Sequence, residues 1–375
     1  MKKTGLFANG LIWVGAAVSI AEIEAGTLVG GNWLALIAGH LLGGLMLAAV
    51  GLIGALTGKN AMSTTSASFG VSGMRFFAVL NVLQLVGWTA VMIAQGGEAV
   101  TALTGWSHVL PMLACAVLLG VGVFVAFGDR LRLATVAMGA LALLAAVLTV
   151  KLIAVPPSTG VASVGFRTAF EISVAMPLSW LPLISDYTST AERPRLASGV
   201  SAAAYTLVSM WMYALGMLIT RMGGTSLADA IVKSGIGTIG LAVIVFSTVT
   251  TTFLDAYSGG ESVKAIFPRS SAKRVGVLVC ALGGGLAVAG LMEHFTGFLY
   301  LISSVFAPMA TVLIVDRYVV KRGCVGWNFA AWFAGVLVYR FASDFPVGPT
   351  LAAILASVTV AFLPVFAGRR DENQV

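Results

Sequence analysis

Two carboxylates, Glu22 and Glu24, lie in the middle of an apolar stretch from Trp13 to Gly31, WVGAAVSIAEIEAGTLVGG. A carboxylate at bilayer depth costs roughly 2.5 to 3.5 kcal/mol on insertion scales, so a chain that keeps two of them must shield them from lipid. On an unbroken helix, residues two apart point about 200° apart, and one of the two carboxylates would then face lipid or a tightly packed neighbour. We therefore predict an interrupted helix, made inexpensive by Gly26 and the glycines that follow it, around a binding site inside the membrane.

A polar helix face is predicted for residues 74 to 100. Asn81, Gln84, Trp88 and Gln95 fall within an arc of roughly 80° when each residue turns the helix by about 100°. Amides beside an indole suit a flat heteroaromatic ligand, because the ring stacks on Trp88 while an amide meets a ring nitrogen or an exocyclic group. The amides could equally join neighbouring helices by hydrogen bonds, and the sequence leaves both roles open.

Small hydroxyl groups and one carboxylate share one side of a helix predicted for residues 236 to 258. They belong to Ser247, Thr248, Thr251, Thr252, Asp255 and Ser258. Hydroxyl oxygens suit an alkali cation when carbonyl groups freed by the broken first helix complete its shell, although such residues also occur where helices pack closely. Asp255 is a functional candidate because of its depth, either meeting a donor on the ligand or taking up a proton.

A second interruption is predicted at Met176 to Pro182, MPLSWLP. Pro177 and Pro182 remove backbone donors inside an apolar run and free carbonyl groups that need another partner. A proline that merely kinks a membrane helix is common. The first and sixth spans, however, occupy corresponding places in two five-helix halves. Paired interruptions of this kind are typical of inverted-repeat secondary transporters, which bind substrate and ion at the breaks.

The composition predicts a polytopic membrane protein. Of 375 residues, 58% are hydrophobic and 10% are charged, with a mean hydropathy of +0.97, whereas soluble proteins carry about 25% charged residues. The formal net charge of +7 comes from basic residues in short loops, without the interleaved aromatic residues of a nucleic-acid-binding patch. The three cysteines and three histidines lack metal-ligand spacing, and no nucleophile and base stand at a catalytic spacing. We therefore expect no metal site of that kind, no disulfide framework and no enzyme.

The apolar runs predict an all-α protein of about twelve transmembrane helices, at about 20 residues per span. The predicted ranges are 7–30, 33–57, 74–100, 108–127, 131–154, 166–187, 196–220, 236–258, 275–292, 296–316, 325–341 and 349–367. With the N-terminus inside, the outer side carries only five of the 22 Lys and Arg, namely Lys151, Arg167, Arg221, Lys233 and Arg340. This split agrees with the positive-inside rule and predicts cytoplasmic termini. We expect a single transporter domain over 1–375, with repeat halves at about 7–154 and 166–316 and extra helices at about 325–367.

Four strings resemble the nucleobase:cation symporter-1 family, and the resemblance runs over essentially the whole chain. They are GAAVSIAEIEAGTL (15–28), LNVLQLVGWTAVMI (80–93), SWLPLISDYT (179–188) and TTTFLDAYSG (250–259). Within the family they most resemble the CytX-type hydroxymethylpyrimidine transporters. The resemblance implies a LeuT-type five-plus-five inverted repeat with broken helices 1 and 6, followed by two C-terminal helices. It also implies import of a pyrimidine-like ring by cation symport.

Site residues follow from this resemblance position by position. It implies a sodium-type site made of carbonyl groups near Val18 and Ala21, the carbonyl of Thr248, and the hydroxyls of Thr251 and Thr252. It places the polar ligand contact of helix one on Glu22 and the stacking aromatic of helix three on Trp88. The remaining predicted substrate-binding residues are Gln84, Ser179, Trp180, Asp255 and Tyr257.

Two positions depart from the family pattern. Pro177 stands where other branches place a second stacking aromatic, so we assign the second wall to Trp180. Glu24 stands where the nearest relatives have an uncharged residue. Glu24 and Asp255 are therefore candidates for proton coupling, and the proton is the alternative to sodium because desolvation favours the neutral form of a carboxyl group.

These features predict a secondary importer of hydroxymethylpyrimidine, a thiamine precursor, in the inner (cytoplasmic) membrane. Glu22 and Asp255 favour an amino-bearing ring, because an ionised carboxylate accepts a hydrogen bond from an amine and repels a carbonyl oxygen. Cytosine or another nucleobase carried by the same mechanism is the alternative ligand, and a channel and an intramembrane enzyme are alternatives from other classes. We expect no cofactor beyond the coupling ion, no nucleic-acid partner, and a monomer in the lipid bilayer.

Overall fold

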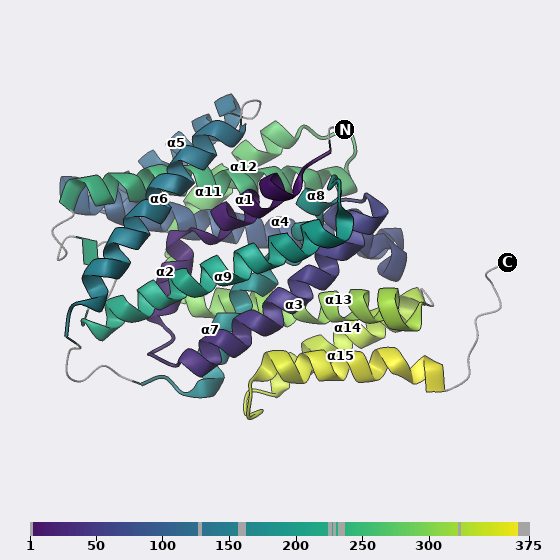
Figure 1. Cartoon of the computed structure of the whole chain (residues 1–375). Helices are drawn as coiled ribbons and strands as arrows, with labels where there is room; N and C mark the ends of the chain where they lie inside the picture. The colour runs from purple at the N-terminus through teal and green to yellow at the C-terminus, as the bar shows by residue number, and fades with distance from the viewer. Residues whose placement is uncertain are drawn as a thin grey trace.

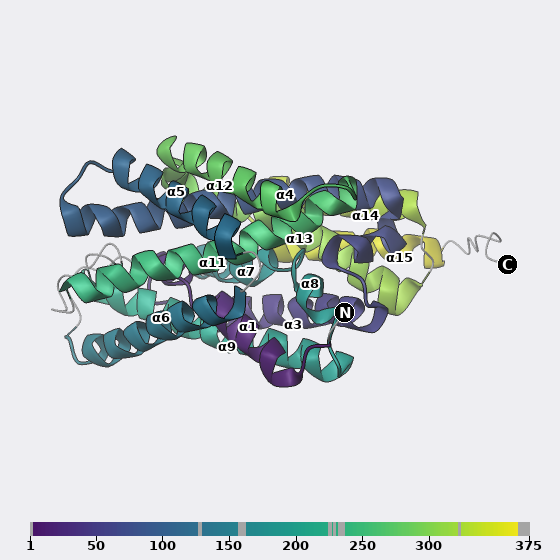
Figure 2. The same cartoon turned by 90° about the horizontal axis from the view of Figure 1, so that it is seen from above.

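The computed structural model describes residues 3–126, 130–156, 163–223, 227, 230–231, 237–321 and 324–366. Over these residues the protein is built from helices, and the β-type pairing there is an isolated bridge between Thr4 and Ala191. Figures 1 and 2 show most helices running lengthwise through one bundle. The predicted all-α fold class is confirmed.

Most helices follow the predicted ranges closely. They are α1 (Leu6–Ala17), α2 (Ile20–Thr27), α3 (Trp33–Thr57), α4 (Ala61–Thr104), α5 (Val109–Ala126), α6 (Arg130–Ile153), α7 (Phe166–Ser179), α8 (Ile184–Thr188), α9 (Pro194–Arg221), α11 (Gly237–Ile266), α12 (Ala272–Val288), α13 (Phe295–Val315), α14 (Val325–Phe341) and α15 (Pro349–Phe366). Two short turns, η1 (Leu291–His294) and η2 (Asp316–Val320), flank α13. Helices α4 and α11 are longer than predicted.

Helix α4 is longer than predicted, because it begins at Ala61 rather than near residue 74. Asn60 caps it by accepting a hydrogen bond from the N–H of Ser63 at 2.9 Å, and Thr64 donates back to the carbonyl of Ala61. Gly70 then interrupts the helix with φ 68° and ψ 178°, a conformation that favours glycine. The first part is therefore a separate polar segment, which a search for apolar spans does not find.

Length and composition mark four described segments as able to cross a membrane: Trp33–Thr57, Ala61–Thr104, Pro194–Arg221 and Leu291–Val320. The bent pair α1 and α2 qualifies as a fifth span when the two are taken together. Shorter apolar helices occur within α5, α6 and α15. The number of twelve spans therefore stays a prediction, although each predicted range overlaps a helix or a broken pair of helices.

The predicted interruption of the first span is present, but it lies earlier than expected. Helices α1 and α2 meet at 49°, and the break falls at Val18 and Ser19. Ser19 accepts a hydrogen bond from the N–H of Glu22 at 3.2 Å, so this N–H does not go to the carbonyl of Val18 four residues back. The expectation that Gly26 forms the break was wrong: a Cβ atom there would lie 2.4 Å from the carbonyl oxygen of Tyr213, so glycine permits α2 and α9 to touch.

The second interruption lies where the prolines predict it. Helix α7 ends at Ser179 and α8 begins at Ile184, with a turn at Trp180 to Leu183 between them. Pro182 is within this turn, while Pro177 lies inside the last turn of α7. Both predicted broken helices are therefore present.

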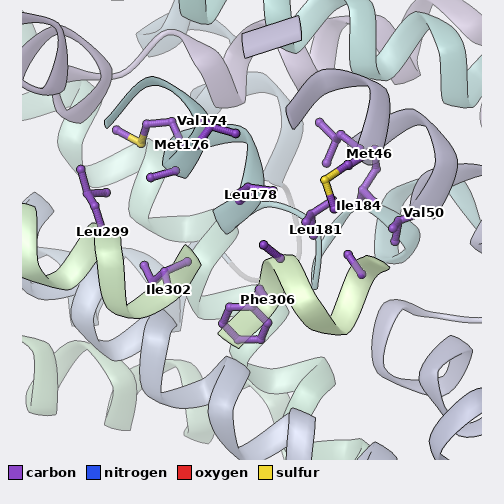
Figure 3. Packing of buried hydrophobic residues seen from close by; sticks show 14 of the residues in the cluster. Met46, Val50, Val174, Met176, Leu178, Leu181, Ile184, Leu299, Ile302 and Phe306 are labelled. Carbon is purple, nitrogen blue, oxygen red and sulfur yellow. The ribbon is translucent and has the colours of Figure 1, made fainter. Parts of the chain in front are cut away.

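Apolar side chains hold the second break in place. Figure 3 shows Met176 and Leu178 of α7 and Leu181 of the turn packed between side chains of α3 and α13. Leu178 and Leu181 are both 0% exposed. Because lipid tails are as apolar as these side chains, the contacts stabilise the break by close packing rather than by removing water.

The last two helices lie beside the bundle. Helices α14 and α15 pack on each other and on α13, on the opposite side of the molecule from α5 and α6 (Figure 1). The start of α1 and the end of α15 lie toward the same end of the bundle in Figures 1 and 2. This arrangement positions the two breaks, with α4, α9 and α11 around them, near the middle of the molecule.

Candidate functional site

A cavity lies between the two broken helices. Its lining residues come from the α1–α2 break, α4, the α7–α8 break and α11, and they are Ala16, Ser19, Ala21, Glu22, Leu85, Trp88, Met92, Met176, Ser179, Trp180, Leu183 and Asp255. The atom-free space between these residues is about 400 Å³, which includes space that is open to the surroundings. The centre of a water molecule can occupy about 20 Å³ of it. The structure therefore brings together five predicted substrate residues, Glu22, Trp88, Ser179, Trp180 and Asp255.

Glu22 is 1% exposed and is held from behind by α9. Tyr205 donates a hydrogen bond to its Oε1 atom, and the hydroxyl oxygen of Ser209 lies 2.7 Å from its Oε2 atom. Tyr205 and Ser209 are four residues apart and so share one face of α9. The carboxyl group is therefore fixed in one orientation at the wall of the cavity.

The two tryptophans stand on different elements of the cavity wall. Trp88 of α4 is 7% exposed and packs edge-on against Phe298 of α13, with ring centroids 5.3 Å apart. Trp180 lies in the turn of the second break and packs edge-on against Trp13 at 5.4 Å. Two indole rings beside acceptor groups form the kind of surface that a flat, polar ring can use.

Gln84 does not line the cavity as predicted. Its Nε2 atom donates to the Oδ1 atom of Asn81 at 2.8 Å and to the carbonyl oxygen of Ser179 at 3.0 Å. Asn81 in turn donates to the Ser262 hydroxyl at 2.8 Å and, at 3.5 Å, to the carbonyl of Pro182. The two amides thus satisfy carbonyl groups that the second break frees, which is the helix-joining role that the sequence left open. The Oε1 atom of Gln84 is buried and has no hydrogen-bond partner among the described residues.

Asp255 and Tyr257 have different surroundings on α11. Asp255 is 5% exposed and lines the cavity. Tyr257 does not line it, because its position two residues along the helix turns it toward Tyr187, with ring centroids 6.2 Å apart. Tyr257 as a substrate-binding residue stays a prediction.

The predicted cation ligands lie on two elements. Val18 is at the first break, and Ala21 lines the cavity. On α11, Thr248 donates its hydroxyl to the carbonyl of Ile244 at 3.0 Å, and Thr252 donates to the carbonyl of Thr248 at 2.8 Å. The predicted ligands here are the Thr248 carbonyl and the Thr252 hydroxyl, and each oxygen keeps a lone pair beyond this hydrogen bond. The side chain of Thr251 lies outside the described residues.

Glu24 lies apart from the cavity. Its side chain is half-buried on α2, and it is not among the described residues that line the cavity. Glu22 and Glu24 thus point to different sides of the same short helix, as two residues two apart must. Both carboxylates therefore fit on one unbroken helix, because Glu22 faces the cavity while Glu24 stays half-exposed.

Sequence reasoning missed the residues behind Glu22. Tyr205 and Ser209 carry a signal, since two hydroxyl groups at i and i+4 on an apolar helix mark one polar face. His40 of α3, whose Nε2 atom lies 2.7 Å from the hydroxyl oxygen of Ser209, lacks metal-ligand spacing and stands alone in its apolar stretch of sequence. No spacing in the sequence connects residues 22, 40 and 209.

Comparison with known proteins agrees with this arrangement. The chain matches a family model described as "Permease for cytosine/purines, uracil, thiamine, allantoin" over residues 2–330. The chain belongs to the nucleobase:cation symporter-1 family. Because the members are permeases, this family member is a membrane transporter and not an enzyme, which confirms that prediction.

The chain is similar to curated relatives and to solved structures. The cytosine permease of Escherichia coli strain K12 is 26% identical over 337 residues, which cover 85% of this chain and 79% of the relative. An inward-facing structure of Mhp1 is 18% identical, with a TM-score of 0.77, and covers 98% of this chain and 92% of its own. A sodium-coupled sialic acid symporter in a substrate-bound outward-open state has a TM-score of 0.71 at 12% identity, over 96% and 90% of the two chains. The symporter fold predicted for this family member is thereby confirmed.

Proposed function

We propose that this symporter imports an aminopyrimidine, with hydroxymethylpyrimidine as the preferred ligand. The observation that carries the proposal is that Glu22 and Asp255 line one cavity together with Trp88 and Trp180. The indole faces suit a flat ring, and the carboxyl oxygens suit its amino group. A transported ring would be bound near the midplane, where helices of both repeat halves meet.

Cytosine is the second candidate ligand. It also carries an amino group on a pyrimidine ring, and the curated relative from Escherichia coli is named a cytosine permease. The donor and acceptor groups described above suit both rings. The substituents that differ between them are a methyl and a hydroxymethyl group on one ring and a ring carbonyl on the other.

We propose that sodium is the coupling ion. Its ligands would be the carbonyls of Val18, Ala21 and Thr248 and the hydroxyls of Thr251 and Thr252. Support comes from Ser19, which takes the N–H that would otherwise bind the Val18 carbonyl, and from the hydroxyl groups of α11. Proton coupling through Glu24 or Asp255 is the alternative.

We propose a single domain of twelve spans, with repeat halves at about 7–154 and 166–316 and both termini in the cytoplasm. The start of α1 and the end of α15 lie toward the same end of the bundle, which supports an even number of membrane crossings. The few basic residues on the predicted outer side support the orientation. We further propose that the protein is a monomer in the inner membrane.

The test is equilibrium binding to the purified, detergent-solubilised protein. Hydroxymethylpyrimidine and cytosine are each titrated with and without sodium, at two pH values. We expect hydroxymethylpyrimidine to bind at least about 10-fold more tightly than cytosine, and its affinity to rise with sodium; a tenfold ratio corresponds to about 1.4 kcal/mol. Tighter binding of cytosine would make cytosine the proposed ligand. An affinity that depends on pH but not on sodium would make the proton the coupling ion. Binding of neither ring would contradict the proposal.

A further inference from the structure

A chain of polar groups extends from Glu22 away from the cavity and across two helices. Ser209 of α9 lies 2.7 Å from Glu22 Oε2 and also 2.7 Å from Nε2 of His40 on α3. His40 is 0% exposed, and its Nδ1 atom lies 3.0 Å from the carbonyl oxygen of Leu36. Ser209 and His40 are outside the set of described residues that line the cavity.

Counting hydrogens along this chain limits what each group can donate. A carbonyl oxygen only accepts, so the Nδ1 atom of His40 must carry the hydrogen that faces Leu36. The hydroxyl of Ser209 has one hydrogen but two neighbours, Oε2 of Glu22 and Nε2 of His40, at hydrogen-bond distance. Both contacts are hydrogen bonds only if the chain holds one further hydrogen, either on Glu22 or on His40.

The two arrangements have the same net charge. In one, a neutral Glu22 donates to Ser209, and Ser209 donates to a neutral His40. In the other, a charged His40 donates to Ser209, and Ser209 donates to the carboxylate of Glu22. Either way the buried group of three has no net charge, which avoids the cost of an isolated carboxylate at bilayer depth.

We infer that Ser209 and His40 are specificity-determining positioning residues, because they hold the shared hydrogen on the far side of Glu22. Tyr205 donates to Oε1 and Ser209 occupies Oε2, so Glu22 presents only acceptor lone pairs to the cavity. An acceptor-only group binds an amino group on the ring and repels an oxygen at the same place. This inference rests on the proposed function and explains how that site selects amino-bearing rings.

The experiment compares two ligands that differ at one position of the ring. Binding of hydroxymethylpyrimidine and of its analogue with oxygen in place of the 4-amino group is measured with the purified full chain. We expect the wild type to prefer the amino ligand by about 100-fold or more, since a site built to hydrogen-bond a group rejects an analogue that lacks it. In Ser209→Ala the hydrogen is no longer held between Glu22 and His40, so Glu22 can turn a donor to the cavity. We expect the preference to fall by about 10-fold or more.

Two further variants separate this role from a merely structural one. Tyr205→Phe removes a hydroxyl from the same carboxyl group but leaves Ser209 and His40 in place, so the affinity should fall while the preference stays within about 3-fold of the wild type. Ser201→Ala changes a buried serine of the same helix whose hydroxyl has no partner in the described structure, and both affinity and preference should be retained.

The outcomes distinguish this inference from the proposed function. A wild type that binds neither ligand overturns the proposed function itself. A wild type that discriminates, together with a folded Ser209→Ala protein of unchanged preference, overturns the inference alone. If Ser209→Ala does not fold, Ser209→Thr keeps the hydroxyl, and His40→Leu removes both the imidazole and any hydrogen-bonding group at that position. Retained preference in the threonine variant and lost preference in the leucine variant support the inference, and the reverse result contradicts it.

Discussion

Glu22, Glu171 and Asp316 are buried carboxylates that accept hydrogen bonds from other helices. Glu171 of α7 accepts from the Thr350 hydroxyl of α15 at 2.7 Å and from the Tyr339 hydroxyl of α14 at 3.2 Å, and Asp316 accepts from the Ser68 hydroxyl of α4 at 2.6 Å. Such contacts offset the cost of burial and join helices that are distant in sequence. Glu22 differs because it also lines the cavity.

At the residue scale, the two carboxyl groups of the cavity can be tested by isosteric replacement. Glu22→Gln and Asp255→Asn each keep the side-chain volume but replace acceptors with an amide that donates. We expect each to lower the uptake of hydroxymethylpyrimidine into cells by at least about 10-fold, or about 1.4 kcal/mol, while the amount of inserted protein stays unchanged. Glu192→Gln, at an exposed position after α8, is the control, and normal uptake kinetics in both cavity variants would remove the carboxylates from the site.

At the element scale, the close approach of α2 and α9 positions Glu22 against its donors. A Cβ atom at Gly216 of α9 would lie 2.0 Å from the carbonyl oxygen of Ile23, and one at Gly26 would meet the backbone of Tyr213. Glycine at both positions lets the two backbones touch, as small residues do between membrane helices. Ser209 then comes within reach of Glu22, seven residues before Gly216 on the same helix.

This contact gives a matched pair of alanine substitutions on α9. Gly216→Ala forces the backbones apart, and we expect it to lower the free energy of unfolding by about 1 to 3 kcal/mol and to weaken ligand binding by more than about 10-fold. Gly199→Ala is the control, because a Cβ atom there meets nothing within 4 Å and alanine favours the helix. Thermal unfolding and ligand titration of the purified variants measure both effects, and equal behaviour of the two variants would contradict the role of this contact.

At the scale of the whole molecule, both breaks are held by helices that carry polar groups to them. Asn81 and Gln84 of α4 bind carbonyl groups of the second break, while α9 binds the carboxyl group of the first. A transporter that alternates access moves one group of helices against another around a fixed site. The hydrogen bonds of α4 to the second break and of α9 to Glu22 beyond the first break connect this site to both helices.

The predicted topology can be tested by labelling single cysteines in intact cells. With the three native cysteines replaced, Ser343→Cys between α14 and α15 should react with a membrane-impermeant maleimide from outside. Lys59→Cys between α3 and α4 should react only after the membrane is permeabilised. Both positions are exposed, so labelling of both from one side would contradict twelve spans with cytoplasmic termini.

The sequence by itself determined the all-helical fold class, the existence of both breaks and five of the residues that line the cavity. Hydropathy, proline and carboxylates at bilayer depth are properties of short stretches, and Glu22, Trp88, Ser179, Trp180 and Asp255 stand out on those grounds or through the family resemblance. The spacing along one helix also showed that Asn81 and Gln84 share a face. It did not show which groups of other helices that face contacts.

Only the tertiary structure decided which of these groups bind one another. It placed the first break at Val18 and Ser19, because the side chain of Ser19 captures the N–H of Glu22, and it used Gly26 for contact with α9. It turned Gln84 to the carbonyl of Ser179 and brought Ser209 and His40 behind Glu22. Such pairings depend on how distant helices pack, and the spacing of residues along one helix does not contain that information.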